Sequence, residues 1–296
     1  MNKNTVLILG AEGMLGQELT RVYRADSFYA VVAWDYEDID VTDFPQTEEK
    51  IRMLSPALIL NAVAYNAVDA CEESEEEYQK ALKLNSEVPG FLACLARDMR
   101  ATLVHYSTDY VFDGLSEEGY TEDAVAHPLS KYGHSKREGE KQLLAAGESY
   151  YLVRLSKLFG KPSISPLGKM CFFEKMLDLA RGKKEISVVD DEKSCFTYAP
   201  DLALATKVLV EEKKPFGIYH LVNSGAVTWY EAAKELFRQA SVDIVVKGVS
   251  ANDFLRPAKR PHSSELRNTK FLSLRPYTEA LEEFLREQMN FEKGVY

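Results

Sequence analysis

Tyr132 and Lys136 lie four residues apart in the stretch "SKYGHSKREGE", where a phenol and an ammonium group could act on the same atom. Residues four apart share one face of a helix, so both side chains can address one point. A tyrosine whose pKa is lowered by a nearby cation can exchange a proton with a carbonyl or an alcohol near neutral pH. Tyr230 and Lys234 repeat the spacing in "WYEAAKELF", an amphipathic stretch that no Gly-rich or Ser/Thr-rich segment precedes. Spacing alone therefore does not identify Tyr132 and Lys136 as catalytic, and the surrounding sequence must decide.

A glycine-rich turn in "TVLILGAEGMLGQEL" directly follows the first apolar run of the chain. Gly10 permits a tight turn, Gly13 lets the backbone approach a diphosphate, and Gly16 allows a helix to pack closely. The N-terminus of that helix would offer backbone amides and positive potential to the phosphates. The pattern predicts dinucleotide binding, with Met14 and Leu15 among the contacts.

An acidic residue, Asp35, follows the second apolar run, "YAVVAW". At this position an acid hydrogen-bonds the 2′-hydroxyl of the adenosine ribose and repels a 2′-phosphate, which favours NADH over NADPH. Asp40 competes for a nearby role, and Val41 beside it is a further expected cofactor contact. The alternative for Asp35 is an ordinary exposed acid in a loop.

These residues need regular elements to hold them, and the first half of the chain alternates short apolar runs with amphipathic ones. The runs "TVLILG", "YAVVAW", "ALILNAV" and "ATLVHYS" are typical of buried strands. The alternation predicts an α/β fold with a doubly wound parallel sheet. The sequence pattern changes after "YYLVRLSKLFG", where "KPSISPLGK" supplies Pro, Ser and Gly before a helical pattern. We expect a cofactor-binding domain over residues 1–158 and a smaller α/β substrate region over 159–296, with parts of about 186–220 returning to the sheet.

The composition limits the partners. The chain has 296 residues and a net charge of -10, which argues against nucleic acid and anionic membranes but not against an anionic small molecule. No apolar run approaches a membrane span, and the start lacks the features of a signal peptide. The four cysteines and five histidines show no metal-ligand spacing, so we expect no metal site and a reduced, cytoplasmic protein.

Several segments, taken in order, carry a family resemblance: "GAEGMLGQEL", "LNAVAYNAVDACE", "LVHYSTDYVFDG", "YGHSKREGE" and "RPHSSELRNTK". Together they resemble the dTDP-4-dehydrorhamnose reductases, within the extended short-chain dehydrogenase/reductase superfamily. The resemblance covers nearly the whole chain and is densest from residue 5 to 140. It implies a Rossmann domain and NADH- or NADPH-dependent reduction of a nucleotide-linked 4-keto-6-deoxy sugar, in polysaccharide precursor synthesis.

The resemblance also implies roles for residues. Tyr132 would donate a proton to the ketone oxygen, and Lys136 would hold the cofactor ribose and favour the tyrosinate after transfer. A hydroxyl at the end of the fourth strand would hydrogen-bond the same oxygen. Ser107 and Thr108 both qualify; the family match favours Thr108 for catalysis and leaves Ser107 as a cofactor contact.

Further positions follow from the same match. Asp109 and Tyr110 would enter the sugar site after Thr108. A second stretch would pack on the cofactor, with its aromatic residue nearest the nicotinamide: Ala62, Val63, Ala64 and Tyr65. The alternative for that stretch is plain strand core.

Two departures from the family pattern concern the sugar. Relatives usually carry an aromatic residue where this chain has Lys157, which we expect to contact the substrate. Relatives also carry Gly and Pro where "DDEKSCFT" has Ser194 and Phe196. These departures leave the identity of the sugar open.

The competing interpretation is a cofactor-binding partner without catalysis, resembling the regulatory subunit of methionine adenosyltransferase. Retention of Thr108, Tyr132 and Lys136 favours the enzyme. The sequence does not decide the oligomeric state, for which a homodimer is one candidate, or any Mg²⁺ dependence.

Overall fold

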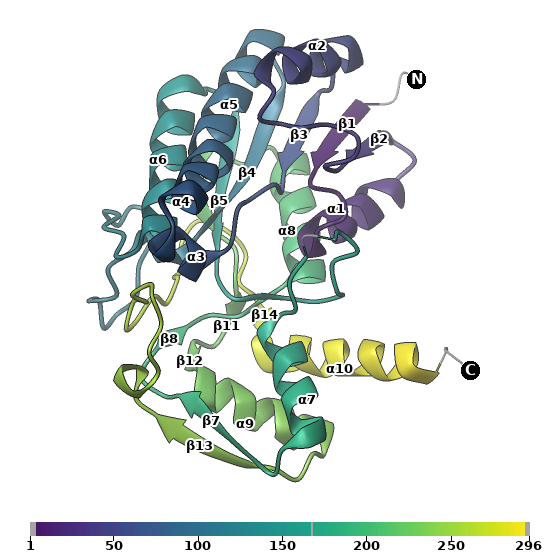
Figure 1. The fold of residues 1–296 in the computed structure, drawn as a ribbon. Helices are drawn as coiled ribbons and strands as arrows, with labels where there is room; N and C mark the ends of the chain where they lie inside the picture. The colour runs from purple at the N-terminus through teal and green to yellow at the C-terminus, as the bar shows by residue number, and fades with distance from the viewer. Residues whose placement is uncertain (1–3, 167, 294–296) are drawn as a thin grey trace.

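The computed structural model describes residues 4–166 and 168–293, and its centre is a six-stranded parallel sheet (Figure 1). Every pairing in this sheet is parallel, and the strand order is β10-β5-β4-β3-β1-β2. The strands are β1 (Asn4–Leu9), β2 (Tyr29–Trp34), β3 (Leu58–Asn61), β4 (Thr102–Thr108), β5 (Tyr150–Leu155) and β10 (Gly217–His220). The order reverses between β1 and β3, and such sheets bind ligands beyond the carboxyl ends of the strands at that point. The predicted α/β fold with a doubly wound sheet is confirmed.

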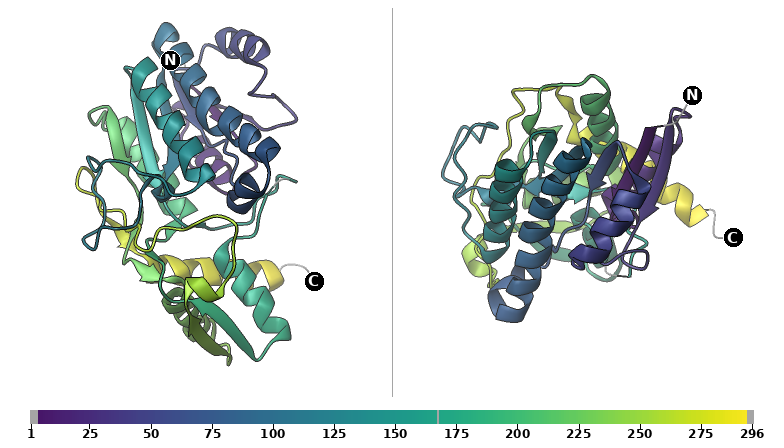
Figure 2. Two further views of the ribbon diagram at one scale, coloured as in Figure 1. Left: turned by 60° about the vertical axis from the view of Figure 1, so that its left-hand side comes forward. Right: turned by 90° about the horizontal axis from the view of Figure 1, so that it is seen from above.

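Helices cover both faces of this sheet (Figure 2). Successive side chains of a strand point to opposite faces, so a strand buried on both sides is a continuous apolar run. In β1, Val6 and Ile8 lie in the core with α1 (Met14–Arg24) and α8 (Ala199–Glu211). On the opposite face, Leu7 and Leu9 join a core with the remaining large helices of this part: α2 (Phe44–Leu54), α5 (Val88–Met99) and α6 (Lys131–Ala146).

Two short helices connect β3 to α5. These are α3 (Val68–Glu73) and α4 (Glu75–Leu82), followed by a π-helical turn, η1 (Lys83–Glu87). A second short turn, the 3₁₀ helix η2 (Asp109–Val111), follows β4 and begins with the Thr108 side chain accepting the amide of Tyr110.

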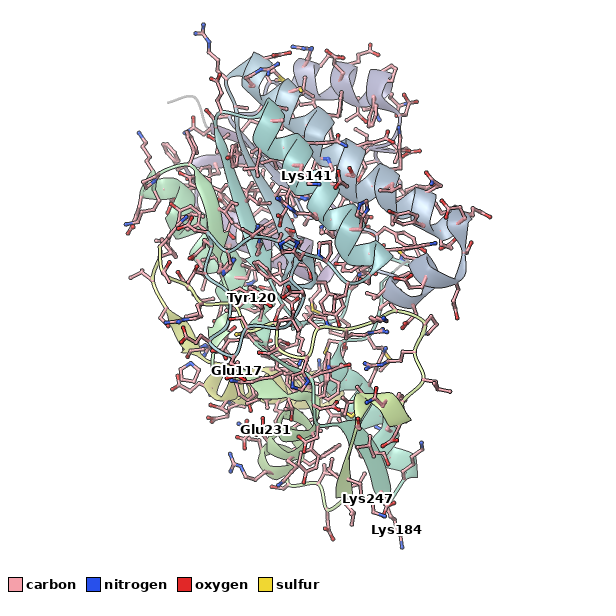
Figure 3. The ribbon with its side chains drawn as sticks, turned by 90° about the vertical axis from the view of Figure 1, so that its left-hand side faces the viewer. Glu117, Tyr120, Lys141, Lys184, Glu231 and Lys247 are labelled. Carbon is pink, nitrogen blue, oxygen red and sulfur yellow. The ribbon has the colours of Figure 1, made fainter. Side chains whose placement is uncertain are left out.

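A second core lies below the carboxyl edge of the sheet in Figure 1. Its elements are α7 (Phe172–Gly182), α9 (Trp229–Ala240), α10 (Tyr277–Lys293) and the parallel pair β7 (Glu185–Val189) and β13 (Val245–Val249). Aromatic side chains fill it, among them Phe159, Phe173, Phe196 and Phe284. Lys184 and Lys247, labelled in Figure 3, mark the end of this part that lies farthest from the sheet.

Short strand pairs and turns complete the second part: β6 (Leu158–Phe159) with β9 (Thr197–Tyr198), β8 (Lys193–Ser194) with β12 (Val227–Thr228), β11 (Asn223–Ser224) with β14 (Leu274–Pro276), and the 3₁₀ helix η3 (Ala251–Asp253). Within the stretch 186–220, β10 joins the six-stranded sheet and α8 packs beside α1, whereas β7 pairs with β13. In the part of the chain that the structure describes, no helix combines the length and apolar character needed to cross a bilayer.

Residues 254–264, called here the bridging segment, connect the two parts. Arg260 makes a two-pronged ion pair with Asp69 of α3, with both nitrogen–oxygen distances 2.6 Å. Arg256 pairs with Glu192, and the Ser264 hydroxyl donates to Asp109 at 2.6 Å. The segment thus holds the second part against the end of β4.

Candidate active site

The glycine turn lies where β1 meets α1. Gly10 has a φ of 76°, in the left-handed region, and a Cβ added at Gly16 would overlap the Gly10 carbonyl oxygen. Gly13 occupies the N-cap position of α1, and no side chain caps the helix there. The amides of Met14 and Leu15 in the first turn therefore stay available to an anion. These features fit a diphosphate-containing dinucleotide.

The two candidate acids behave differently. Asp35 lies against the glycine turn, because its Oδ2 accepts the Glu12 amide at 2.8 Å and its Oδ1 accepts the Tyr36 amide at 2.8 Å. Asp40 instead stabilises its own turn through the amide and hydroxyl of Thr42. The Val41 side chain is buried in the core below α2. The structure therefore brings Asp35 to the turn and leaves Asp40 in a local contact.

The stretch after β3 lies beside the glycine turn, since a Cβ on Gly10 would come within 3.1 Å of the Ala62 carbonyl carbon. Two asparagines fix it. Asn61 accepts the Val63 amide at 3.2 Å and pairs with His105. Asn85 accepts the Tyr65 amide at 2.9 Å and donates to the Tyr65 carbonyl at 2.8 Å, holding the backbone from Ala62 through Ala64 to Tyr65. Sequence reasoning missed both asparagines; a polar residue ending the apolar run "LILN" was the available signal.

Tyr132 lies in the first turn of α6, which the Ser130 side chain caps by accepting the Gly133 amide at 3.1 Å. A Cβ at Gly133 would overlap the Tyr110 carbonyl oxygen, so glycine permits α6 to approach η2 this closely. The Tyr132 ring is buried and meets the Tyr110 ring edge-on, with centroids 5.9 Å apart.

Burial raises the pKa of Tyr132, while a hydrogen bond with the Thr108 side chain works in the opposite direction. Desolvation of the phenolate by burial is the largest of these influences on the pKa of Tyr132. The consequence still suits a proton donor: the phenol is protonated at neutral pH.

Lys136 lies one turn farther along α6, and its buried Nζ donates to the Tyr106 carbonyl of β4 at 2.8 Å. Burial lowers the pKa of Lys136 to about 8, and the charge of Glu140 opposes that shift. The other pair with the same spacing differs, since Lys234 is exposed and its Nζ lies 5.1 Å from the ring centroid of Tyr230. Only the first pair is directed at the sheet.

Ser107 and Thr108 are adjacent in β4 and point to opposite sides, as alternation requires. The Ser107 hydroxyl donates to Glu140 at 2.7 Å, and Glu140 is itself paired with Arg154. The Thr108 hydroxyl donates to Asp109 at 3.1 Å and interacts with Tyr132. Thr108 is thus on the side of the phenol, whereas Ser107 belongs to a buried ion-pair network.

A small cavity of about 10 Å³ adjoins Tyr110. It is lined by Tyr110, Lys157, Glu192, Lys193, Ser194, Trp229, Arg260, Pro261 and Ser264. Lys157 lines this cavity together with Ser264, whose hydroxyl donates to the Asp109 carboxylate at 2.6 Å. Sequence reasoning identified the segments containing Glu192 and Ser264 but assigned neither residue, and it passed over Trp229 beside Tyr230.

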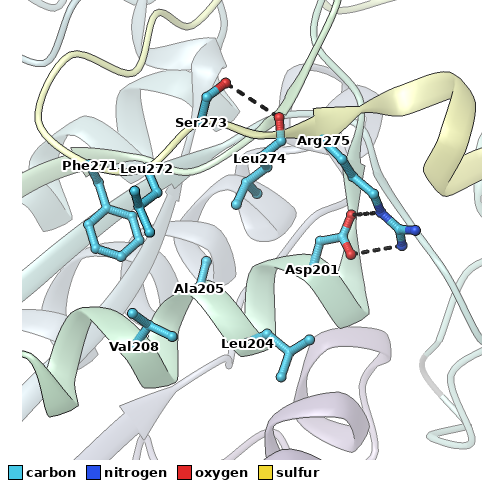
Figure 4. A pocket seen from close by; sticks show the side chains of 9 residues that line it. All are labelled: Asp201, Leu204, Ala205, Val208, Phe271, Leu272, Ser273, Leu274 and Arg275. Carbon is cyan, nitrogen blue, oxygen red and sulfur yellow. Dashed lines mark hydrogen bonds and ion pairs between the residues drawn. The ribbon is translucent and has the colours of Figure 1, made fainter.

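A larger recess of about 270 Å³ lies elsewhere, between α8 and the residues before α10 (Figure 4). Its walls are mostly apolar, with the Arg275–Asp201 ion pair at one end. None of the residues predicted for the site lines it. The arrangement of polar groups, rather than the size of a cavity, therefore locates the chemistry.

Comparisons with known proteins agree with this geometry. A family model described as "RmlD substrate binding domain" matches residues 4–290. A protein of Aggregatibacter actinomycetemcomitans named dTDP-4-dehydrorhamnose reductase is 34% identical over 276 residues, covering 90% of this chain and 91% of that protein. The spore coat polysaccharide biosynthesis protein SpsK of Bacillus subtilis (strain 168) is 33% identical over 287 residues, covering 96% and 97%. A crystal structure of dTDP-4-dehydrorhamnose reductase from Bacillus anthracis str. Ames, in complex with NADP, has a TM-score of 0.90 and 32% identity, covering 97% and 100%.

Proposed function

Because the chain belongs to the family described as the RmlD substrate binding domain, we propose that it reduces the ketone of a nucleotide-linked 4-keto-6-deoxy sugar with NAD(P)H. One observation carries the proposal: Thr108, Tyr132 and Lys136 are buried together around the end of β4. The relatives' names place this chemistry in the synthesis of activated sugars for polysaccharides, and we assign this chain the same role.

The cofactor site fits a dinucleotide. The uncapped start of α1 and the close glycine turn would hold the diphosphate, and the backbone after β3 would lie along the rest of the molecule. A relative of known structure binds NADP, and the choice between NADH and NADPH at Asp35 stays a prediction. When bound, the nicotinamide supplies the hydride.

The protein's own residues handle the proton. The Tyr132 phenol, which is protonated at neutral pH, donates its proton to the ketone oxygen as charge develops there. Thr108 orients the same oxygen through its hydroxyl. Lys136, held on β4 by the Tyr106 carbonyl, stabilises the tyrosinate that remains.

We propose that residues 1–158, together with α8 and the sheet strand β10, form the cofactor-binding part. The rest of residues 159–296 mainly binds the sugar nucleotide. The free thiols of Cys71, Cys94, Cys171 and Cys195 support a reducing compartment, and we assign the enzyme to the cytoplasm. A homodimer stays a candidate assembly.

The decisive experiment supplies purified protein with NADH or NADPH and dTDP-4-dehydrorhamnose and follows loss of the reduced nicotinamide. We expect oxidation that depends on the sugar. If the protein binds the cofactor tightly but reduces none of a panel of dTDP-, GDP- and UDP-linked 4-keto sugars, the regulatory-subunit alternative replaces the enzyme.

A further inference from the structure

Lys157 has an unusual backbone for a lysine. Its φ of 40° lies in the left-handed region, which residues with a Cβ seldom adopt. Contacts with β9 hold it there: the Lys157 carbonyl accepts the Thr197 amide at 3.3 Å, and the Thr197 hydroxyl donates to the Ser156 carbonyl at 2.6 Å. The surrounding structure thus fixes the direction of this side chain.

The Lys157 amino group is buried without a hydrogen-bond partner among residues 4–166 and 168–293. It lies 3.8 Å from a ring centroid of Trp229 and 4.9 Å from that of Phe196. Contact with aromatic faces offsets only part of the cost of removing an amino group from water. A donor in this state, lining a cavity, is suited to an acceptor that the protein does not supply.

The neighbouring carboxylates show what kind of acceptor fits. Glu192 is already matched by Arg256 at 3.0 Å and by the Trp229 indole at 3.2 Å. Asp109 accepts from the hydroxyls of Thr108 and Ser264 and has no ion-pair partner in the described ranges. Lys157 and Asp109 act on each other's pKa, and burial shifts both toward their neutral forms. The pair carries no net charge whether both are ionised or both neutral, so an uncharged group that both accepts and donates suits it.

We propose that one hydroxyl of the sugar bridges Lys157 and Asp109, accepting from the amino group and donating to the carboxylate, and that Lys157 thereby determines substrate specificity. This inference rests on the proposed function. Asp109 directly follows Thr108, which would face the ketone at C4. In a 4-keto-6-deoxyhexose the neighbours of C4 are C5, with its methyl group, and C3, with its hydroxyl. The substrates are therefore nucleotide-linked 4-keto-6-deoxy sugars that retain the C3 hydroxyl.

The test compares three dTDP-linked 4-keto-6-deoxy sugars: the fully hydroxylated one, its 3-deoxy analogue and its 2-deoxy analogue. A site built to hydrogen-bond a hydroxyl rejects an analogue without it, so we expect kcat/KM for the 3-deoxy sugar to be at least about 100-fold lower. In Lys157→Met, kcat/KM for the two sugars with a C3 hydroxyl should fall about 10- to 100-fold, as for one lost polar contact. In the same variant, kcat/KM for the 3-deoxy sugar should change less than about two-fold, so the variant should no longer distinguish it strongly from the hydroxylated sugar.

Two variants control the comparison. Lys193→Met removes another lysine from the same cavity, but its side chain is 44% exposed and its ammonium is paired with Glu265 at 2.9 Å, so discrimination between the hydroxylated and 3-deoxy sugars should persist. Lys157→Gln keeps an N–H donor and should therefore retain part of the discrimination between the hydroxylated and 3-deoxy sugars. Cofactor affinity, measured by titration, should be unchanged throughout.

Calorimetric binding of the three sugars separates this inference from the proposed function. Absence of reduction with selective binding rejects the function but keeps the Lys157 contact. Equal kcat/KM and equal binding for the hydroxylated and 3-deoxy sugars in the wild type overturn the inference. So does a Lys157→Met variant that weakens all three sugars alike.

Discussion

At the scale of single residues, Tyr132 is the proposed proton donor, and its ring is buried beside Tyr110. Replacing it with Phe removes only the phenolic proton donor and keeps the edge-on contact with Tyr110. We expect Tyr132→Phe to lower kcat by about 10²–10⁴-fold, the usual range for general acid catalysis, with cofactor affinity within a few-fold of wild type. Steady-state kinetics and cofactor titration measure both.

The matched control is Tyr230→Phe, which alters the same residue type at the same distance from a lysine. Tyr230 lies on α9 with an exposed lysine over its ring, so normal turnover is expected. A Tyr132→Phe protein that keeps more than half of the wild-type rate would remove Tyr132 from the mechanism.

Lys136 gives the reaction a pH dependence. Burial lowers the pKa of Lys136 to about 8, so its ammonium is lost as the pH rises through that value. We therefore expect kcat/KM to fall above about pH 8, since kcat/KM reports groups of the free enzyme. Because the charge of Glu140 raises this pKa, Glu140→Gln should move the decline to lower pH.

The profile should be recorded in Lys157→Met as well, to separate the second buried lysine near the site. A decline common to both backgrounds belongs to Lys136. A flat profile to pH 10 would show that the ionisation of Lys136 does not limit the reaction.

The Asp35 carboxylate accepts backbone amides and also lies beside the glycine turn, where we expect the adenosine ribose of the cofactor. An acid here disfavours a 2′-phosphate, so the wild type should use NADH with a higher kcat/KM than NADPH. Asp35→Ala should lower kcat/KM for NADH and narrow or reverse the ratio of kcat/KM for NADH to that for NADPH. Kinetics with both cofactors decide this, and equal efficiency in the wild type would contradict it.

At the scale of elements, α6 must stay pressed against β4 and β5 for Tyr132 and Lys136 to meet the substrate. Its main tie is buried: Glu140 of α6 pairs with Arg154 of β5 at 2.8 and 2.9 Å. Breaking a buried pair costs about 3–5 kcal/mol when it leaves a charge without any partner, whereas here Arg137 still lies 3.4 Å from Glu140. Arg154→Met should therefore lower the free energy of unfolding by up to about that amount, as measured by urea denaturation.

A surface pair on the same helix is the control. Lys141, labelled in Figure 3, pairs with Glu138 at 2.6 Å and is 54% exposed. Exposed pairs contribute about 0–1 kcal/mol, so Lys141→Met should barely change the unfolding midpoint. Equal losses in the two variants would mean that the buried pair does not tie α6 to the sheet.

At the scale of the whole molecule, the bridging segment decides how the second part meets the sheet. Asp69 holds it through Arg260 and through the Ala258 amide, and the bond from Arg260 keeps the pKa of Asp69 low. Asp69→Asn should loosen the segment, raise KM for the sugar nucleotide several-fold and leave kcat and cofactor affinity nearly unchanged. Amide hydrogen exchange in residues 254–264 should increase.

Asp123→Asn serves for comparison, because Asp123 is 82% exposed and its pair with Lys270 lies outside that segment. Its kinetics should match the wild type. If Asp69→Asn leaves both KM and exchange unaltered, the ion pair does not position the segment.

The sequence by itself determined what depends on neighbours along the chain. Short continuous apolar runs became β1 to β4, and the glycine turn joined β1 to α1, because backbone geometry and burial act over a few residues. Tyr132 and Lys136 share a helical face for the same local reason. Family motifs, rather than spacing, distinguished them from Tyr230 and Lys234.

Only the tertiary structure decided how distant segments meet. It directed Thr108 toward Tyr132 and Ser107 toward Glu140. It placed Asp35 rather than Asp40 against the glycine turn and surrounded the Lys157 amino group with Trp229 and Phe196. It also buried the Tyr132 phenol, which raises the pKa of that group. Burial and electrostatic partners depend on contacts between residues far apart in sequence, and no local pattern encodes them.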